Sequence, residues 1–309
     1  MANINKISTY ISPSRIKVSN LVGELRLPEQ TNLMMKKFGV EQVAVEKEKN
    51  IDEMLVEAAK KILEPNPSIV DNIGTILVTY TFSPIYPYLY EPLMEFQKEY
   101  GLEKAQLLSV AQMNCASLNL AIEIARRSVK ANSARSDVLL LIGDKIITPE
   151  MRYLNESTFS GDAAAAIYVS SDGGYNRIVS NSLYCEGKLY NSIESPESQY
   201  KWFLQSSPFG VVKVVRQALK EGKIPLDLID CFFPSNVNTV LWNRVASMLD
   251  LPISKFYFPS LKDVGHAHNA DPIINFERAQ KANIVKKNHY YGLISIGIGG
   301  TFGCTVIQH

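Results

Sequence analysis

The chain has 309 residues, 46% of them hydrophobic, and its 32 basic and 31 acidic side chains leave a formal net charge of +1. This length predicts about two domains, or one two-lobed unit with a sizeable core. The near-neutral charge argues against a general affinity for nucleic acid or anionic membranes. The first 20 residues lack the apolar core of a signal peptide, and no stretch approaches the ~20 apolar residues of a membrane span. We therefore expect a soluble cytoplasmic protein.

Short apolar runs alternate with amphipathic stretches along the first half of the chain. Residues 50–63 carry apolar side chains at i, i+3 and i+4 spacing, which predicts a helix capped by Asn50 or Asp52. The remaining predicted helices are 91–100 and 116–130, and the predicted strands are 74–81, 106–110 and 137–142. Residues 163–169 form an apolar, alanine-rich segment that suits a crowded core.

A break in composition at residues 170–176, rich in Ser, Gly and Asp, marks the expected boundary between two lobes. We expect an N-terminal half over residues 1–172 and a C-terminal half over residues 173–309. The second half repeats the style of the first, with helices predicted at 209–221, 237–249 and 273–286 and strands at 230–233, 290–296 and 301–307. This alternation predicts an α/β fold with largely parallel sheets covered on both faces.

The four cysteines, Cys115, Cys185, Cys231 and Cys304, are widely spaced and include no CxxC pair, so neither a zinc site nor a redox dithiol is expected. Cys115 differs from the others because it follows a predicted strand and opens a predicted helix. A helix N-terminus carries partial positive charge and free N–H donors, which favour the reactive thiolate. Cys115 is therefore the candidate nucleophile, the alternative being a small buried apolar residue. The other three are expected to be structural.

Five segments, taken in order, resemble those of the ketoacyl-ACP synthase III family of thiolase-fold condensing enzymes. They are residues 109–125 around Cys115, 159–169, 231–252, 264–279 and the glycine-rich end at 295–307. The resemblance covers nearly the whole chain. It implies two duplicated βαβαβαββ halves in a layered α-β-α-β-α architecture. It also implies a dimer, either a homodimer or a heterodimer with a paralogue.

Two positions depart from the family pattern at its catalytic residues. The family's catalytic His falls on Ser235, and its catalytic Asn falls on His266. A serine cannot act as a base at neutral pH as an imidazole does. The resemblance therefore implies a catalytic set of Cys115, His266 and Ser235, in which His266 takes over acid/base or oxyanion-stabilising work. Elongating condensing enzymes use a Cys-His-His arrangement that this would resemble, whereas a purely structural His266 would hydrogen-bond to backbone in a polar loop.

Four further residues are candidates for substrate binding. Asn238 keeps the Asn of the family's PHQAN motif, and His268 lies two residues beyond His266, on the same face of an extended segment. The C-terminal glycine cluster, which includes Gly299 and Gly300, does not form a nucleotide-binding GxGxxG motif and predicts a tight turn near the active site. We expect no metal ligands and no cofactor. The substrate would be an acyl thioester of coenzyme A or of an acyl-carrier protein.

The binding of free coenzyme A is expected to be weaker than in the family. Gln42 and Val43 stand where the family has arginines that hold a phosphate and the adenine. Acyl groups presented on a carrier protein would then be favoured, although Lys36 and Lys37 could substitute for the arginines or be solvated surface charges. Asp162, in the second segment, is expected to be structural.

An aromatic-rich stretch at residues 79–92 stands where the family forms its dimer contact and acyl-pocket wall. Its aromatic side chains are Tyr80, Phe82, Tyr86, Tyr88 and Tyr90. We expect interface or pocket lining there, with ordinary core packing as an equal alternative.

The sequence therefore predicts an acyl-thioester condensing enzyme or acyltransferase. Cys115 would take an acyl group and pass it to a carbon, nitrogen or oxygen nucleophile. The altered catalytic positions point to specialised, secondary metabolism and away from the fatty-acid starter enzyme. The alternative is a catalytically weak partner subunit of a heteromeric condensing enzyme, which the loss of His at Ser235 would favour. A serine hydrolase is not expected, because the chain lacks a G-x-S-x-G elbow.

Overall fold

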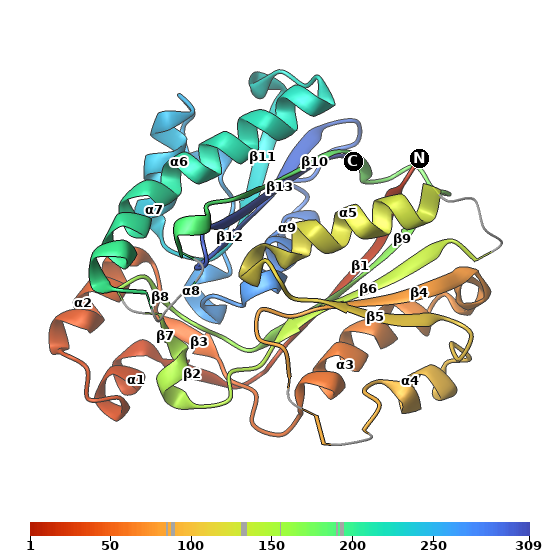
Figure 1. The fold of residues 1–309 in the computed structure, drawn as a ribbon, viewed down its shortest axis with the longest axis horizontal. Helices are drawn as coiled ribbons and strands as arrows, with labels where there is room; N and C mark the ends of the chain where they lie inside the picture. Colours follow the sequence, from red (N-terminus) through yellow and green to blue (C-terminus); the bar gives the residue numbers. More distant parts are fainter. Residues whose placement is uncertain (85, 88–89, 131–134, 155, 190, 192–194) are drawn as a thin grey trace.

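The computed structural model describes residues 1–84, 86–87, 90–130, 135–154, 156–189, 191 and 195–309 (Figure 1). A mixed nine-stranded sheet runs through it in the order β11-β12-β13-β10-β1-β9-β6-β4-β5. The strands from the first half of the chain are β1 (Asn3–Ile11), β4 (Ile73–Thr79), β5 (Gln106–Val110), β6 (Asp137–Asp144) and β9 (Ala163–Ser170). Those from the second half are β10 (Arg177–Cys185), β11 (Ile229–Pro234), β12 (Tyr290–Gly297) and β13 (Thr301–Gln308). A pairing of Asn3 with Arg177 joins the two parts of the sheet.

The two parts of the sheet repeat one topology. In the first part, β4 is parallel to β5 and β6, and β9 is antiparallel to β6 and β1. In the second part, β11 is parallel to β12, and β13 is antiparallel to β12 and β10. A parallel bridge between Phe232 and Phe256 stands where the first part has its β4–β5 pairing. The duplicated thiolase-like architecture is therefore confirmed, although the two halves share no repeat visible in the sequence.

The helices form three layers around these two parts of the sheet (Figure 1). The outer helices are α3 (Ile51–Leu63) and α4 (Met94–Glu99) on the first part and α6 (Glu197–Gly222) and α7 (Thr239–Met248) on the second. Between the parts lie α5 (Ser117–Lys130) and α9 (Asp271–Lys281), whose side chains share one core with strands of both parts. This is the predicted α-β-α-β-α layering.

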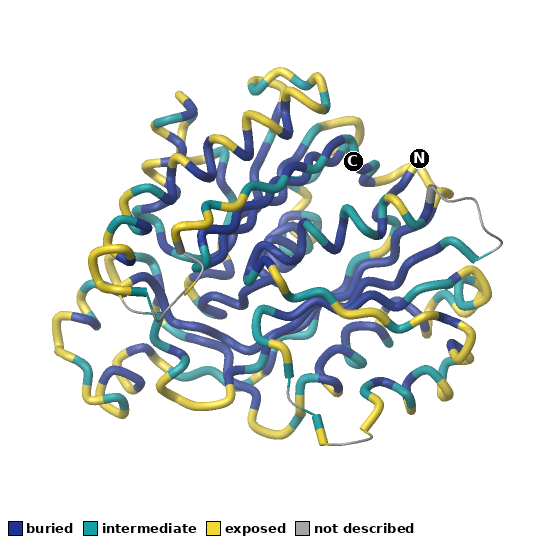
Figure 2. Tube along the Cα trace, viewed as in Figure 1, coloured by how far each residue is buried: buried dark blue, intermediate teal, exposed yellow. Residues whose placement is uncertain are grey.

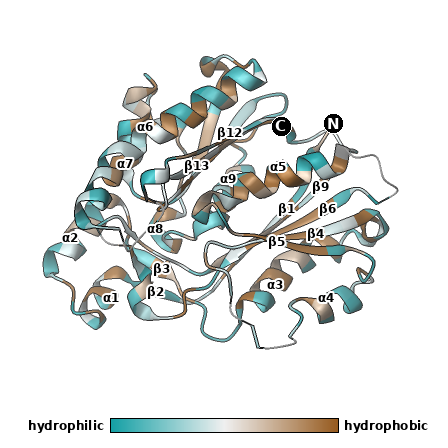
Figure 3. Ribbon diagram, in the orientation of Figure 1, coloured by the Kyte–Doolittle hydropathy of each residue, from teal (hydrophilic) through white to brown (hydrophobic). Residues whose placement is uncertain are grey.

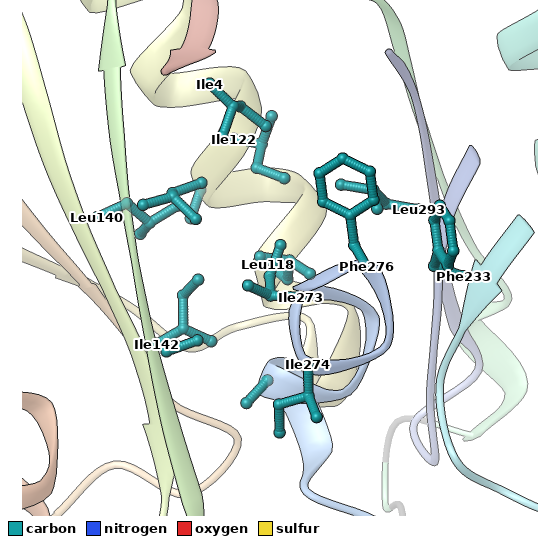
Figure 4. Close-up of a cluster of buried hydrophobic side chains, with 14 of the residues drawn as sticks. Ile4, Leu118, Ile122, Leu140, Ile142, Phe233, Ile273, Ile274, Phe276 and Leu293 are labelled. Atoms are coloured by element: carbon teal, nitrogen blue, oxygen red, sulfur yellow. The ribbon is translucent and has the colours of Figure 1, made fainter. Parts of the chain in front are cut away.

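The pattern of side chains along β6 shows how the sequence produces these layers. Leu139 and Leu141 pack with α3, whereas Leu140 and Ile142 point to the other face and pack with α5. Figure 4 shows this inner core, with α5 and α9 between the facing strands. A strand buried on both faces reads as a continuous apolar run, which is why its burial could be predicted. Most strands accordingly form the buried, hydrophobic centre of the molecule, with the edge strand β5 as an exposed exception, and the other exposed residues gather on the outer helices and loops (Figures 2 and 3).

A smaller cluster of short elements packs against the sheet near the start of β9, where the N–H of Asp162 donates to the carbonyl of Ala44. Its members are α1 (Val18–Glu24), α2 (Glu29–Phe38), α8 (Leu261–Val264) and the strand pairs β2 (Arg15–Lys17) with β3 (Gln42–Ala44) and β7 (Tyr153–Leu154) with β8 (Thr158–Phe159). The segment that follows α8 carries His266 and His268, so this cluster determines where both imidazoles lie.

The predicted helices differ in how well their ends agree with the structure. The helix at residues 50–63 is confirmed as α3, with Asn50 and Glu53 forming a capping box. The predictions at 91–100 and 273–286 are too long, because α4 starts only at Met94 and α9 ends at Lys281, just before Asn283 adopts a positive φ of 56°. No helix in the described ranges is long and apolar enough to cross a bilayer.

The helix predicted at 209–221 is wrong at its start, because α6 begins at Glu197 and continues through Pro208. Proline lacks the N–H that would bond to the carbonyl four residues earlier, that of Leu204. The Ser207 hydroxyl donates to this carbonyl at 3.4 Å and replaces the missing bond. The sequence boundary at residue 172 lies in the turn between β9 and β10, and the division into two units stays a prediction.

Candidate active site

Cys115 lies in a single 3-10 turn, Asn114–Ala116, between the end of β5 and the start of α5. The backbone of Asn114 has a positive φ of 47°, and Cys115 is only 5% exposed. The turn at the end of β12 supports it from behind, where a Cβ on Gly297 would lie 2.8 Å from the carbonyl oxygen of Met113. The nucleophile candidate is therefore held in a tight, buried turn at the N-terminus of a long helix.

Two imidazoles contact the sulfur of Cys115. His266 Nε2 lies 3.4 Å and His268 Nδ1 3.3 Å from Sγ. Both residues are buried, and both come from the segment between α8 and α9, which packs beside the start of α5. The structure therefore brings Cys115, His266 and His268 together, although 151 residues separate the first two in sequence.

A buried carboxylate holds His266 from the side away from Cys115. Asp271 Oδ2 lies 2.5 Å from His266 Nδ1 and accepts from the backbone N–H of Asn236 at 2.7 Å, while Oδ1 accepts from that of Ala267 at 2.7 Å. Burial lowers the pKa of His266, but the carboxylate of Asp271 and the sulfur of Cys115 outweigh it and raise this pKa to about 10. His266 is therefore an imidazolium at neutral pH, with Nδ1–H donating to Asp271 and Nε2–H donating to Cys115.

His268 has the opposite electrostatic character. Burial, followed by the positive charges of His266 and Arg152, lowers the pKa of His268 well below its ordinary value. The ring of Phe82 packs edge-on against it at a centroid distance of 5.4 Å. The sulfur of Cys115 thus contacts one charged and one neutral imidazole.

The cluster also has the donor atoms of a metal site. Sγ of Cys115, Nε2 of His266 and Nδ1 of His268 all lie within 4.8 Å of one another, and thiolate and imidazole suit Zn²⁺. Asp271 bonds to the other ring nitrogen of His266 and so stands outside this set. We interpret the cluster as a nucleophile with two imidazoles, because the separations of sulfur from both ring nitrogens already fit hydrogen bonds.

Two cavities meet at Cys115. The smaller, about 180 Å³, lies on the His266 side, and its lining includes Phe38, Asn238 and Arg244. The larger, about 410 Å³, lies on the His268 side and is mainly apolar. Its lining includes Phe82, Met151, Tyr153, Leu154 and Tyr200. A ligand in either cavity can reach the sulfur.

The other predicted site residues lie at different distances from this centre. Asn238 lines the smaller cavity and caps α7 by accepting from the N–H of Leu241 at 2.8 Å. Ser235 is fully buried, its Oγ accepts from the N–H of Ile296 at 3.4 Å, and it is not among the residues that line the cavities at Cys115. In the β12–β13 turn, Ile298 lines both cavities, and Gly299 and Gly300 line neither.

Sequence reasoning did not single out Asp271 or Arg244. Asp271 precedes a proline at the start of a predicted helix, a place where an acid is usually read as a helix cap. Only its position five residues after His266 hinted at a partnership. Arg244 is an exposed charge on a predicted helix, and nothing in the sequence relates it to a cavity that separate segments enclose.

The aromatic stretch combines anchoring with cavity lining. The hydroxyls of Tyr86 and Tyr90 donate to Asp52 on α3 at 2.8 and 3.4 Å, and Tyr80 is buried. Phe82 lines the larger cavity, as expected for a pocket wall. The expectation for Tyr88 lies outside the described residues.

Asp162 shows the structural role expected of it. Its buried carboxylate accepts from both Nη atoms of Arg152, at 3.1 and 2.7 Å, and from the backbone N–H groups of Glu46 and Ile146. These bonds join β9 to the segments after β3 and β6. Val43, at one position where the family's arginines were expected, is fully buried in β3.

Gly265 determines the position of His266 and provides a first prediction. Its φ of 76° and ψ of −155° belong to a region that only glycine adopts readily, and a Cβ there would lie 2.7 Å from the carbonyl oxygen of Phe159. We expect Gly265→Ala to lower the free energy of unfolding by about 1–3 kcal/mol, measured by denaturant titration. The matched control is Gly23→Ala in α1, where no atom lies within 4 Å of the new Cβ and a small gain in stability is expected. Equal stability of Gly265→Ala and the parent protein would contradict this account.

Comparisons with known proteins agree with this geometry. Residues 219–309 match the family model described as the C-terminal region of 3-oxoacyl-[acyl-carrier-protein] synthase III. The β-ketoacyl-[acyl-carrier-protein] synthase III of Latilactobacillus sakei is 24% identical over 297 residues, covering 88% of this chain and 89% of the relative. That of Wolbachia pipientis wMel is 26% identical over 271 residues, covering 83% of each chain.

Solved structures of low sequence identity share the fold over the whole chain. The 3-oxoacyl-[acyl-carrier-protein] synthase III of Aquifex aeolicus has a TM-score of 0.86 at 18% identity and covers 100% of both chains. A structure named as the acyltransferase ChlB3 also has a TM-score of 0.86, at 17% identity, covering 99% of this chain and 97% of the other.

The fold and the site together define a thiolase-fold condensing enzyme with a Cys-His-His arrangement. With these relatives, the chain is a ketoacyl-ACP synthase III-like acyltransferase, a distant homologue at about 24% identity.

Proposed function

We propose that the enzyme carries an acyl group on Cys115, taken from an acyl thioester of coenzyme A or of a carrier protein, and passes it to a carbon, nitrogen or oxygen nucleophile. The observation that carries this proposal is the contact of one sulfur with a charged and a neutral imidazole at the junction of two cavities. Cys115, His266 and His268 are the proposed reacting residues.

In the loading step, the sulfur of Cys115 attacks the carbonyl carbon of the donor thioester. A carbon–sulfur bond to Cys115 forms, the carbon–sulfur bond to the donor breaks, and the departing thiolate takes a proton from Nε2 of His266. The imidazolium also stabilises the negative charge that develops during attack. His268, which is neutral, can then accept a proton from the acceptor during the second step. Ser235 has no role in this scheme beyond its bond to the backbone of Ile296.

The two cavities suit two parts of the donor. The smaller cavity is lined by Asn238 and by the exposed Arg244. It therefore suits the polar arm of the donor thioester, and Arg244 would lie near the phosphate group of that arm. The larger apolar one suits an acyl group well beyond acetyl in size. The missing arginines at Gln42 and Val43 favour a carrier-protein donor over free coenzyme A.

Filling each cavity in turn gives a second prediction. Met151→Trp narrows the larger cavity and is expected to slow loading of long acyl donors by about tenfold or more, with acetyl donors little changed. Val240→Phe narrows the smaller cavity and is expected to slow every donor alike. Initial loading rates with a short and a long acyl donor check both. If Met151→Trp slowed short and long donors equally, the larger cavity would not hold the acyl chain.

A role in specialised metabolism is supported by the altered positions Ser235 and His266. Two structurally similar proteins are named as the acyltransferase ChlB3 and as the priming β-ketosynthase of a polyketide biosynthetic pathway. A cytoplasmic location remains part of this proposal. A dimer is supported by β5, an edge strand of the sheet with Leu108 47% exposed, and a homodimer or a heterodimer with a paralogue would cover it.

A panel of acyl-coenzyme A and acyl-carrier thioesters tests the proposal by intact-protein mass spectrometry, followed by a chase of the loaded protein with malonyl, amine and alcohol acceptors. We expect at least one donor to add the mass of its acyl group and one acceptor class to remove it. If no donor loads the protein alone but one does after a paralogous subunit is added, the partner-subunit alternative would replace this proposal.

A further inference from the structure

A third polar group reaches the sulfur of Cys115 from β4. The hydroxyl of Thr81, two residues beyond the end of this strand, lies 3.5 Å from Sγ. It approaches from a different chain segment than His266 and His268, which both follow α8. Neither the sequence motifs nor the proposed mechanism uses this residue.

The neighbours of Thr81 determine which way its hydroxyl points. Asn269 Nδ2 donates to Thr81 Oγ1 at 2.9 Å, while its Oδ1 accepts from the backbone N–H of Leu118 at 2.8 Å. Because the Leu118 N–H can only donate, the orientation of the Asn269 amide is fixed, with its NH₂ group towards Thr81. Thr81 Oγ1 is then an acceptor from Asn269, and its own proton is free to be donated elsewhere.

A buried carboxylate holds the backbone of Thr81 in place. Asp144 Oδ1 accepts from the N–H groups of Thr81 and Phe82, at 2.7 and 3.2 Å, and Asp144 is 2% exposed. The Thr81 hydroxyl also faces this carboxylate, so its proton has two acceptors available, Asp144 and Cys115. The measurement below distinguishes them.

We propose that Thr81 is a further catalytic residue, whose hydroxyl donates to the sulfur of Cys115 and stabilises its thiolate, and that Asn269 is the positioning residue that orients this hydroxyl. The inference rests on the proposed role of Cys115 as nucleophile. With His266 and His268, Thr81 gives the sulfur three hydrogen-bonding partners, and such bonds to a charged acceptor are stronger than those to a neutral one.

The test measures the alkylation of Cys115 by iodoacetamide. Because this reaction needs no acyl donor, failure of the inference about Thr81 can be distinguished from failure of the proposed function. Peptide mass spectrometry separates Cys115 from the exposed Cys185. Thr81→Val removes the hydroxyl and keeps the shape, and Thr81→Ser restores the hydroxyl. Thr79→Val is the matched control, because Thr79 is the last residue of β4, two positions before Thr81, and is buried with a hydroxyl that has no hydrogen-bond partner among the described atoms.

At neutral pH we expect Thr81→Val to slow the alkylation of Cys115 by roughly three- to tenfold, and to move the midpoint of its pH profile upward. Thr81→Ser should stay close to the parent protein, and Thr79→Val should be unchanged. Thr81→Ala serves as a second removal if Thr81→Val does not fold. If Thr81→Val were alkylated at the parent rate, the Thr81 proton would be assigned to Asp144 and the inference would be overturned. An equal slowing in Thr79→Val would also overturn it, because the effect would then not be specific to the Thr81 hydroxyl.

Discussion

The His266→Gln variant is expected to load acyl groups about 10²–10⁴-fold more slowly than the parent protein. Glutamine keeps a polar group of similar size, but it cannot carry the positive charge that His266 has at neutral pH. The sulfur of Cys115 would lose its charged partner at 3.4 Å, and the leaving thiolate would lose its proton source. The measurement is the rate at which the protein gains the acyl mass from the best donor, determined by mass spectrometry of samples quenched at successive times.

The control for this variant is Ser235→Ala. Ser235 stands where the family has its catalytic His, yet its Oγ contacts the backbone of Ile296 rather than Cys115. We therefore expect Ser235→Ala to load at nearly the parent rate. If Ser235→Ala lost as much loading activity as His266→Gln, the claim that His266 has replaced the family's catalytic histidine at position 235 would be wrong.

The Asp271→Asn variant is expected to lose roughly 10- to 100-fold in loading rate, through its effect on His266. The variant keeps the size of the side chain but removes the charge that raises the pKa of His266. As pH rises, His266 of the variant should lose its proton earlier, so the loading rate of the variant should begin to fall at a lower pH than that of the parent. Loading rates measured from pH 6 to 10 check this, and identical pH profiles would rule out Asp271 as the partner that keeps His266 charged.

The same ion pair predicts how stability depends on pH. The pKa of His266 is about 10 in the folded protein, above its ordinary value of 6.5. The protonated ring therefore stabilises the fold fully below pH 6.5, less as pH rises, and not at all above about pH 10. In Asp271→Asn, the free energy of unfolding should lose most of this decline with rising pH. Chemical unfolding of both proteins at several pH values would measure the difference.

Much of this fold could be predicted from residue patterns, because the spacing of apolar residues along the sequence shows which faces of a helix or strand are buried. The apolar run of β6 and the capped, amphipathic α3 belong to this class. The start of α6 could not be predicted, since Pro208 normally ends a helix and only the Ser207–Leu204 contact shows how it is accommodated. The ends of α4 and α9 depended on backbone conformations at Leu93 and Asn283 that sequence does not specify.

The candidate site divides in the same way. Cys115 and His266 could be proposed because motif order fixes which segments meet. The contact of His268 with the sulfur was only weakly indicated, because it depends on a positive φ of 51° at that residue. Asp271, Thr81 and Asn269 could not be assigned, because their roles come from hydrogen bonds between segments far apart in the chain.

The central claim is that Cys115 carries the acyl group, and peptide mapping of the loaded protein tests it most directly. We expect the acyl mass on the peptide that contains Cys115, and no adduct in Cys115→Ala, while Cys185→Ala loads like the parent protein. An adduct that persists in Cys115→Ala, or that maps to another cysteine, would contradict the account.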